Sequence, residues 1–130
     1  MAVDTNILVH LYDDIQQQTR IVAEQLTSQE PVISQQVITE YLNISRRLLP
    51  VPKDEVLRRC NLVFAVCKIA PTTHSTLALA ARLLARYDFQ LFDSIVVAAA
   101  LEANCTTLYS ADFQHNQLIE GRLRIINPFV

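Results

Sequence analysis

The chain alternates between short apolar runs and longer stretches in which apolar residues recur at helical spacing. The short runs predict strands over residues 2–3, 30–34, 67–71, 105–110 and 122–127. The longer stretches predict helices over residues 7–12, 16–28, 35–49, 52–66, 73–86 and 92–103. Strands that alternate with helices need crossover connections, which are typical of a parallel sheet covered on both faces. The pattern therefore predicts a single α/β domain over residues 1–130.

Composition narrows the class of protein. Hydrophobic residues make up 51% of the chain, and no apolar window is long enough to span a bilayer. The N-terminus lacks the basic flank of a signal peptide, so we expect a cytoplasmic protein. The three cysteines have no C-x-x-C spacing, which argues against a disulfide framework and a cysteine zinc site. Two of them, Cys60 and Cys67, lie two turns apart on one helical pattern and are expected in the core.

Glycine content and charge limit the ways in which this chain can bind phosphate. Gly121 is the one glycine, so a P-loop or a dinucleotide-binding turn is excluded. The net charge of −2 gives no overall electrostatic footprint for nucleic acid. Arginines do cluster, in the pairs Arg46 and Arg47, Arg58 and Arg59, Arg82 and Arg86, and Arg122 and Arg124. They would bind phosphate together only if the fold gathers them around one cleft.

Four acidic residues are predicted at one edge of the sheet. Ligands of open α/β sheets bind outside the carboxyl ends of the strands. We expect four acids to follow or face these strand ends: Asp4, Glu40, Asp93 and Asp112. Each acid also has an ordinary alternative explanation. Asp4 could serve only as a helix N-cap, and Asp112 only as a turn residue. Glu40 could be an exposed helical acid, and Asp93 an acid favoured by the helix dipole. Their joint position on one edge favours a shared site.

Clustered carboxylates indicate a particular chemistry. They raise one another's pKa unless cations lie between them, and hard oxygen ligands select Mg²⁺ or Mn²⁺. Such ions can activate water for hydrolysis of a phosphodiester, with no nucleophilic side chain. The hydroxyl groups of Thr5 and Ser110 adjoin two of the acids and are candidates for orienting water or phosphate. Ordinary turn hydrogen bonds are an equally good explanation for both hydroxyls.

Several segments together resemble the PIN domain, and more narrowly the VapC-like toxins of bacterial type II toxin–antitoxin systems. The segments are "DTNILV" (4–9), "ITEYLNISRR" (38–47), "FDSIVVAAAL" (92–101) and "TLYSADFQHNQLIEGRLRIINPF" (107–129). The resemblance runs from the first residues to the last. It implies a three-layer α/β/α, Rossmann-like fold with a central parallel sheet of four to five strands. It also implies an acidic Mg²⁺ or Mn²⁺ pocket and endoribonuclease activity on RNA.

Site residues and partners follow from the same resemblance. The four acids Asp4, Glu40, Asp93 and Asp112 match the family's catalytic metal-site acids, Asn6 its supporting asparagine and Ser110 its hydroxyl residue before the last acid. The family also implies a homodimer and a cognate antitoxin that blocks the site. Arg46 and Arg47, just past Glu40, are our candidates for holding the RNA backbone.

The chain departs from the family pattern at two places. Relatives usually carry several apolar residues before the first acid, whereas Asp4 is preceded here by only three residues. This first strand is expected to be central, so its shortness would weaken the sheet. Ala111 stands where relatives commonly have an acidic residue, which removes one possible extra ligand.

Three other functions share parts of this pattern. A nuclease acting on DNA or on structured nucleic acid would use the same acids. A catalytically silent binding module would keep the fold for contact with a partner. A phosphate-accepting receiver domain is also α/β with an acidic pocket, but it needs a lysine after its last strand, and none follows Ile126.

Overall fold

The computed structural model describes residues 1–12, 16–48 and 52–130, without the side chains of Tyr12, Ser45, Arg46 and Leu48. The helices are α1 (Thr5–Val9), α2 (Gln17–Thr27), α3 (Gln35–Leu48), α4 (Lys53–Val66), α5 (His74–Arg86) and α6 (Leu91–Glu102), with a 3₁₀ turn, η1 (His10–Tyr12). The strands are β1 (Ala2–Val3), β2 (Val32–Ser34), β3 (Lys68–Ala70), β4 (Thr107–Tyr109), β5 (Leu118–Ile119) and β6 (Leu123–Ile126). Every helix and strand predicted from the sequence is therefore present, with small shifts at the ends.

The strands form one sheet in the order β3-β2-β1-β4-β6-β5. The five predicted strands pair in parallel, while β5 pairs antiparallel with β6. The expected α/β class and central parallel sheet of four to five strands are confirmed, and β5 adds a sixth, antiparallel strand at the edge. β5 is only two residues long and half exposed, so it leaves almost no apolar pattern. A turn with positive φ at Glu120 and Gly121 folds it back onto β6.

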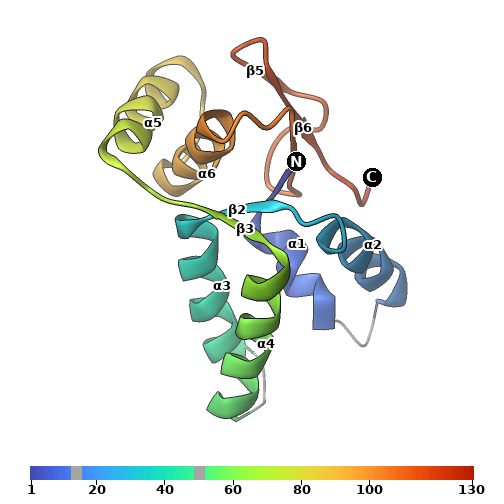
Figure 1. The fold of residues 1–130 in the computed structure, drawn as a ribbon. Helices are drawn as coiled ribbons and strands as arrows, with labels where there is room; N and C mark the ends of the chain where they lie inside the picture. Colours follow the sequence, from blue (N-terminus) through green and yellow to red (C-terminus); the bar gives the residue numbers. More distant parts are fainter. Residues whose placement is uncertain (13–15, 49–51) are drawn as a thin grey trace.

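Helices cover both faces of the sheet. α5 and α6 pack together on one side of β2 and β3, and α1, α3 and α4 lie on the other (Figure 1). The N-terminal strand β1 runs through the middle of this assembly, between β2 and β4. The central position expected for the first strand is confirmed.

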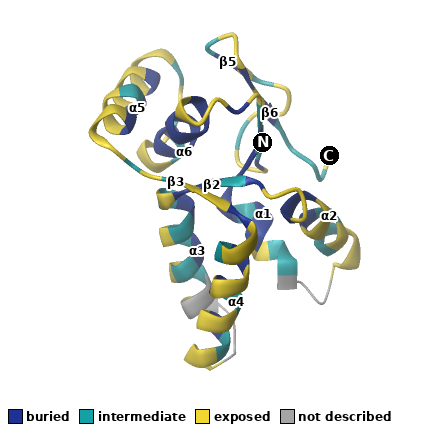
Figure 2. Cartoon of the chain, viewed as in Figure 1, coloured by how far each residue is buried: buried dark blue, intermediate teal, exposed yellow. Residues whose placement is uncertain are grey.

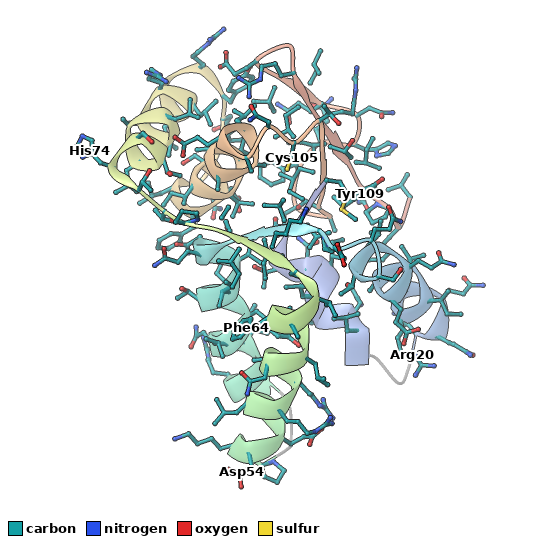
Figure 3. The ribbon with its side chains drawn as sticks, viewed as in Figure 1. Arg20, Asp54, Phe64, His74, Cys105 and Tyr109 are labelled. Carbon is teal, nitrogen blue, oxygen red and sulfur yellow. The ribbon has the colours of Figure 1, made fainter. Side chains whose placement is uncertain are left out.

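The core is built around α6 and the central strands. Residues 94–101 of α6 are all buried, as the apolar sequence of this helix predicts, and the helix is dark blue in Figure 2. Cys60 and Cys67 are buried as expected, and Cys105 joins them; all three are free thiols. Figure 3 places Cys105 in the interior beside α6, whereas His74 points outward from the start of α5. Among the described helices, none combines the length and apolarity needed to cross a membrane.

Two local features stabilise α5, which packs on α6. Thr73 caps α5 in a capping box, in which its hydroxyl accepts from the Thr76 N–H at 3.3 Å and its own N–H donates to the Thr76 hydroxyl at 3.0 Å. At the other end of the helix, the side chain of Leu83 is completely buried. Because α6 carries Asp93 at its start, this packing also supports the candidate site.

Leu83→Ala should lower the free energy of unfolding by about 2–5 kcal/mol, because it leaves a cavity at a fully buried position. Leu84→Ala is the matched control on the same helix. Its side chain is 37% exposed, so the loss should stay below about 1 kcal/mol. Urea unfolding followed by circular dichroism measures both changes. Equal losses for the two variants would contradict the assigned face of α5.

Candidate metal centre

Asp4 lies where β1 ends and α1 begins. Strand pairing continues up to it, since its N–H donates to the Tyr109 carbonyl at 3.0 Å. Its carboxylate is buried and accepts two hydrogen bonds, from the Thr5 N–H at 2.7 Å and from the Ser110 hydroxyl at 2.8 Å. The first of these bonds caps α1. Asp4 is therefore an N-cap of α1 through one carboxylate oxygen, as its ordinary alternative explanation predicts. This capping role does not exclude a further role for the second carboxylate oxygen.

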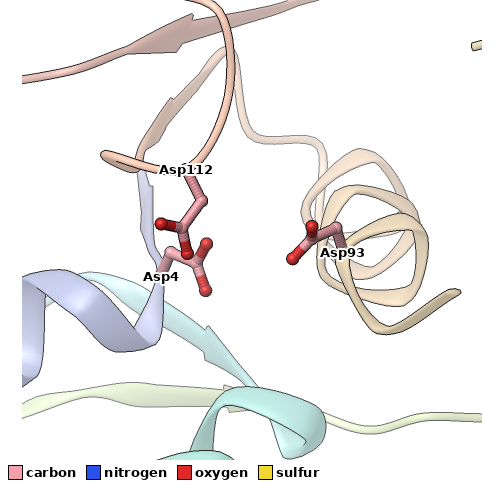
Figure 4. Close-up of side chains that lie close together, drawn as sticks. All are labelled: Asp4, Asp93 and Asp112. Carbon is pink, nitrogen blue, oxygen red and sulfur yellow. The ribbon is translucent and has the colours of Figure 1, made fainter. Parts of the chain in front are cut away.

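Three of the four predicted acids converge at this point. Asp4, Asp93 and Asp112 each offer a carboxylate oxygen, and these oxygens lie within 4.8 Å of one another (Figure 4). Asp93 comes from the first turn of α6, and Asp112 from the loop after β4. We call this group the acid cluster. It brings together segments separated by about 90 and 20 positions in the sequence, as the rule for parallel sheet edges predicts.

Asn6 and Ser110 hold the acid cluster in place. The Asn6 amide donates to the Asp112 carboxylate at 3.0 Å and to the Ser110 hydroxyl at 3.2 Å, and its oxygen accepts from the Ala111 N–H at 3.0 Å. The Asp112 N–H donates to the Ser110 hydroxyl at 3.1 Å. Ser110 is completely buried. These bonds join α1 to the loop after β4 and thereby set the separation of Asp4 and Asp112.

Glu40 lies beside the acid cluster and is not a member of the group within 4.8 Å. Its carboxylate accepts from the Thr5 hydroxyl at 2.7 Å and from the Gln36 amide at 3.2 Å. Its charge is nevertheless close enough to raise the pKa of Asp4 and of Asp93. The Thr5 hydroxyl, a candidate for orienting water or phosphate or for an ordinary hydrogen bond, thus donates to an acid. Gln36 was not predicted, although its position one helical turn before Glu40 on α3 was a usable signal.

Burial and nearby negative charges make two members of the acid cluster, Asp4 and Asp93, costly to ionise. The pKa of Asp4 is raised to about 6, chiefly by burial and to a lesser extent by the charges of Asp112 and Glu40, despite the opposing hydrogen bonds from Ser110 and Thr5. The pKa of Asp93 is also raised, first by burial and then by the same two charges. Among the described residues, no lysine or arginine forms a hydrogen bond or an ion pair with the cluster. Such a site favours a bound cation.

The arginines lie in different parts of the structure. Arg47 is exposed on α3, seven residues after Glu40, which places it on the same helix face about 10 Å away. The side chain of Arg46 lies outside the described residues. Elsewhere, Arg82, Arg86 and Arg122 line one cavity of about 350 Å³, but none of the four acids lines it. There, Arg86 pairs with Glu120 at 2.7 Å and Arg122 donates to the Leu101 carbonyl at 2.7 Å.

The sequence matches the PIN domain family over residues 1–120, so the chain belongs to this family. PIN nucleases generally depend on divalent metal ions, in keeping with the acid cluster. No curated protein matches the chain in sequence.

Several solved structures share the fold. A toxin–antitoxin complex from Klebsiella pneumoniae is 20% identical, with a TM-score of 0.74 and 98% of both chains covered. FitAcB from Neisseria gonorrhoeae is 17% identical, with a TM-score of 0.73, and covers 98% of this chain and 97% of its own. VapC20 from Mycobacterium tuberculosis, described as a toxin that cleaves the sarcin-ricin loop, is 19% identical, with a TM-score of 0.61. That match covers 85% of this chain and 88% of VapC20. At these identities the likeness shows the fold.

In the absence of metal, the free energy of unfolding should fall as the pH rises from about 4 to 6. The pKa of Asp4 is about 6 in the folded chain against an ordinary value of 3.8, so in this window the folded state keeps a proton that the unfolded state has lost. The loss is on the order of 3 kcal/mol. Urea unfolding in EDTA across this range measures it. Asp4→Asn should flatten the slope, whereas Asp54→Asn on exposed α4 should keep it; equal slopes would contradict the raised pKa.

Proposed function

We propose that this protein is a metal-dependent endoribonuclease of the VapC-like toxin type, which hydrolyses RNA phosphodiester bonds. The observation that carries the proposal is the acid cluster itself. Three carboxylates from three distant segments lie within 4.8 Å of one another at the carboxyl edge of a parallel sheet. Holding them there costs stability, as the raised pKa of Asp4 indicates, so a purely structural role explains them poorly.

The donor set suits Mg²⁺ or Mn²⁺, because carboxylate oxygens are the ligands these hard cations prefer. Asp4, Asp93 and Asp112 would hold the ion, with Glu40 beside them as the fourth acid. A divalent ion held by these acids would supply positive charge for the phosphate and would lower the pKa of a water molecule. Among the described residues, this group contains no histidine or cysteine thiolate, the ligands that would favour zinc.

The surrounding residues have distinct tasks in this proposal. Ser110 and the Thr5 N–H keep the Asp4 carboxylate oriented, and Asn6 does the same for Asp112. The Thr5 hydroxyl and the Gln36 amide hold the Glu40 carboxylate beside the cluster. Arg47, two turns farther along α3, would contact the RNA backbone, as would Arg46. The products would carry a 5′-phosphate and a 3′-hydroxyl.

Partners are proposed by analogy with structures of the same fold. The Klebsiella structure is a toxin–antitoxin complex, and VapBC2 from Rickettsia felis was solved bound to a DNA fragment from its promoter. We therefore propose a cognate antitoxin, and from the family resemblance we propose a homodimeric toxin. RNA is preferred as substrate because VapC20 is described as cleaving the sarcin-ricin loop. A nuclease acting on DNA is the second candidate, since it would use the same acids.

Excess Mn²⁺ should raise the unfolding temperature of the wild-type protein, because a ligand that binds only the folded state stabilises it. At a free concentration of 100 times Kd the gain would be about 2.7 kcal/mol. Asp93→Asn should lose most of this rise, while Asp54→Asn should keep it. Asp54 is a suitable control because it is exposed at the start of α4, far from the sheet (Figure 3). A rise of equal size in both variants would place the metal elsewhere.

Single-stranded RNA should be cleaved in the presence of Mg²⁺ or Mn²⁺, and EDTA should stop the reaction. Asp4→Asn, Asp93→Asn and Asp112→Asn should each lower kcat/KM by at least about a hundredfold, as loss of a group that acts on the reacting atoms typically does. Asp54→Asn should stay near wild type. Product mapping on RNA and DNA of the same sequence distinguishes the two candidates. Wild-type products from the Asp93→Asn protein would refute the assignment of the acids.

A further inference from the structure

A cavity of about 380 Å³ opens directly beside the acid cluster. Two of its lining residues, Asp93 and Asp112, belong to the cluster itself. The rest of the wall comes from Asp88, two phenylalanines and three glutamines. Its volume falls within the range of about 300–1,000 Å³ that is typical of small-molecule sites. We call it the side cavity.

The aromatic wall of the side cavity is rigidly supported. Phe113 and Phe89 meet edge to face with ring centroids 5.2 Å apart, and Phe89 stacks on Tyr87 at 5.2 Å with 12° between the ring planes. At the far end of this row, the Tyr87 hydroxyl accepts a hydrogen bond from the Glu120 N–H at 3.0 Å. Phe113 directly follows Asp112, so its ring is held next to the proposed metal ligands.

The polar wall has unused hydrogen-bonding groups. Within the described part of the chain, the side-chain amides of Gln90, Gln114 and Gln117 make no hydrogen bond to another residue. Gln90 is the N-cap of α6, yet its side chain does not cap the helix. Each amide offers both donors and an acceptor, which is what reading the edge of a nucleobase requires.

Charge argues against a phosphate in the side cavity. Among the described residues, three carboxylates and no lysine or arginine line it. A phosphate not paired with a cation would be repelled there, whereas a neutral base that stacks on an aromatic ring and bonds through its edge would not. The phosphate of the same nucleotide would instead lie at the acid cluster with its cation.

From these features we infer that the side cavity binds the base of a nucleotide adjoining the scissile phosphate, with Phe113 as the stacking surface and the glutamines as readers of the base edge. This inference rests on the proposed nuclease function and extends it to substrate selection. It makes Phe113, Gln114 and Gln117 residues that determine specificity.

The test uses nucleoside 5′-monophosphates with Mg²⁺, followed by NMR of the aromatic side chains. The four nucleotides should shift the Phe113 ring signals, while ribose 5-phosphate, which has no base, should not. Phe113→Leu should weaken nucleotide binding about tenfold, as loss of a stacking ring typically does. Phe92→Leu is the matched control, because Phe92 adjoins Asp93 but is exposed and does not line the side cavity. The double variant Gln114→Ala, Gln117→Ala should reduce the differences in affinity among the four bases.

The inference is overturned if Phe113→Leu binds the nucleotides as the wild type does, or if ribose 5-phosphate shifts the Phe113 ring equally. An RNA cleavage assay on the same proteins separates this result from the nuclease proposal. Nucleotide binding that depends on Phe113, without RNA cleavage, supports the side cavity and refutes the nuclease. Cleavage by the wild type, with unchanged nucleotide binding by Phe113→Leu, supports the nuclease and refutes the side cavity. The Mn²⁺-dependent rise in unfolding temperature should persist in every side-cavity variant, which shows that they fold.

Discussion

The burial of one carboxylate at the end of the central strand constrains the rest of the site. Asp4 lies between β1 and α1, and its two oxygens face in different directions: one caps the helix and the other meets Ser110. Ser110 in turn connects to Asn6 and to the backbone of Asp112. Moving Asp4 would therefore disturb the helix start, the sheet edge and the loop after β4 together. This coupling explains how a two-residue strand can position a site accurately.

The stability of the fold and the arrangement of the acids oppose each other. Burial and like charges raise the pKa values of Asp4 and Asp93, so the ionised cluster weakens the folded state without a cation. The apolar packing of α5 on α6 and the buried central strands offset this cost. The first strand is short, but pairing on both sides and the added bonds of Met1 and Asp4 compensate for its length.

The acid cluster and the side cavity share their supports. α6 contributes Asp93 to both, and the loop after β4 contributes Asp112 to both, followed at once by Phe113. Because the same two segments carry the proposed metal ligands and the proposed base contacts, a nucleotide could be held at its phosphate and its base by one rigid unit. The aromatic row from Tyr87 to Phe113 adds a further link to the β5–β6 turn.

The apolar pattern by itself determined the helices, the five parallel strands and the burial of α6, because periodicity reports directly on which faces leave water. It also indicated that the acids meet, since strand ends in a parallel sheet share an edge. It could not reveal β5, whose two residues carry no period, nor that Glu40 lies beside the three-aspartate group, held by Thr5 and Gln36. Nor could the apolar pattern reveal the side cavity, or that none of the four acids lines the cavity formed by Arg82, Arg86 and Arg122. Those features depend on distances between segments far apart in the chain, and only tertiary packing sets such distances.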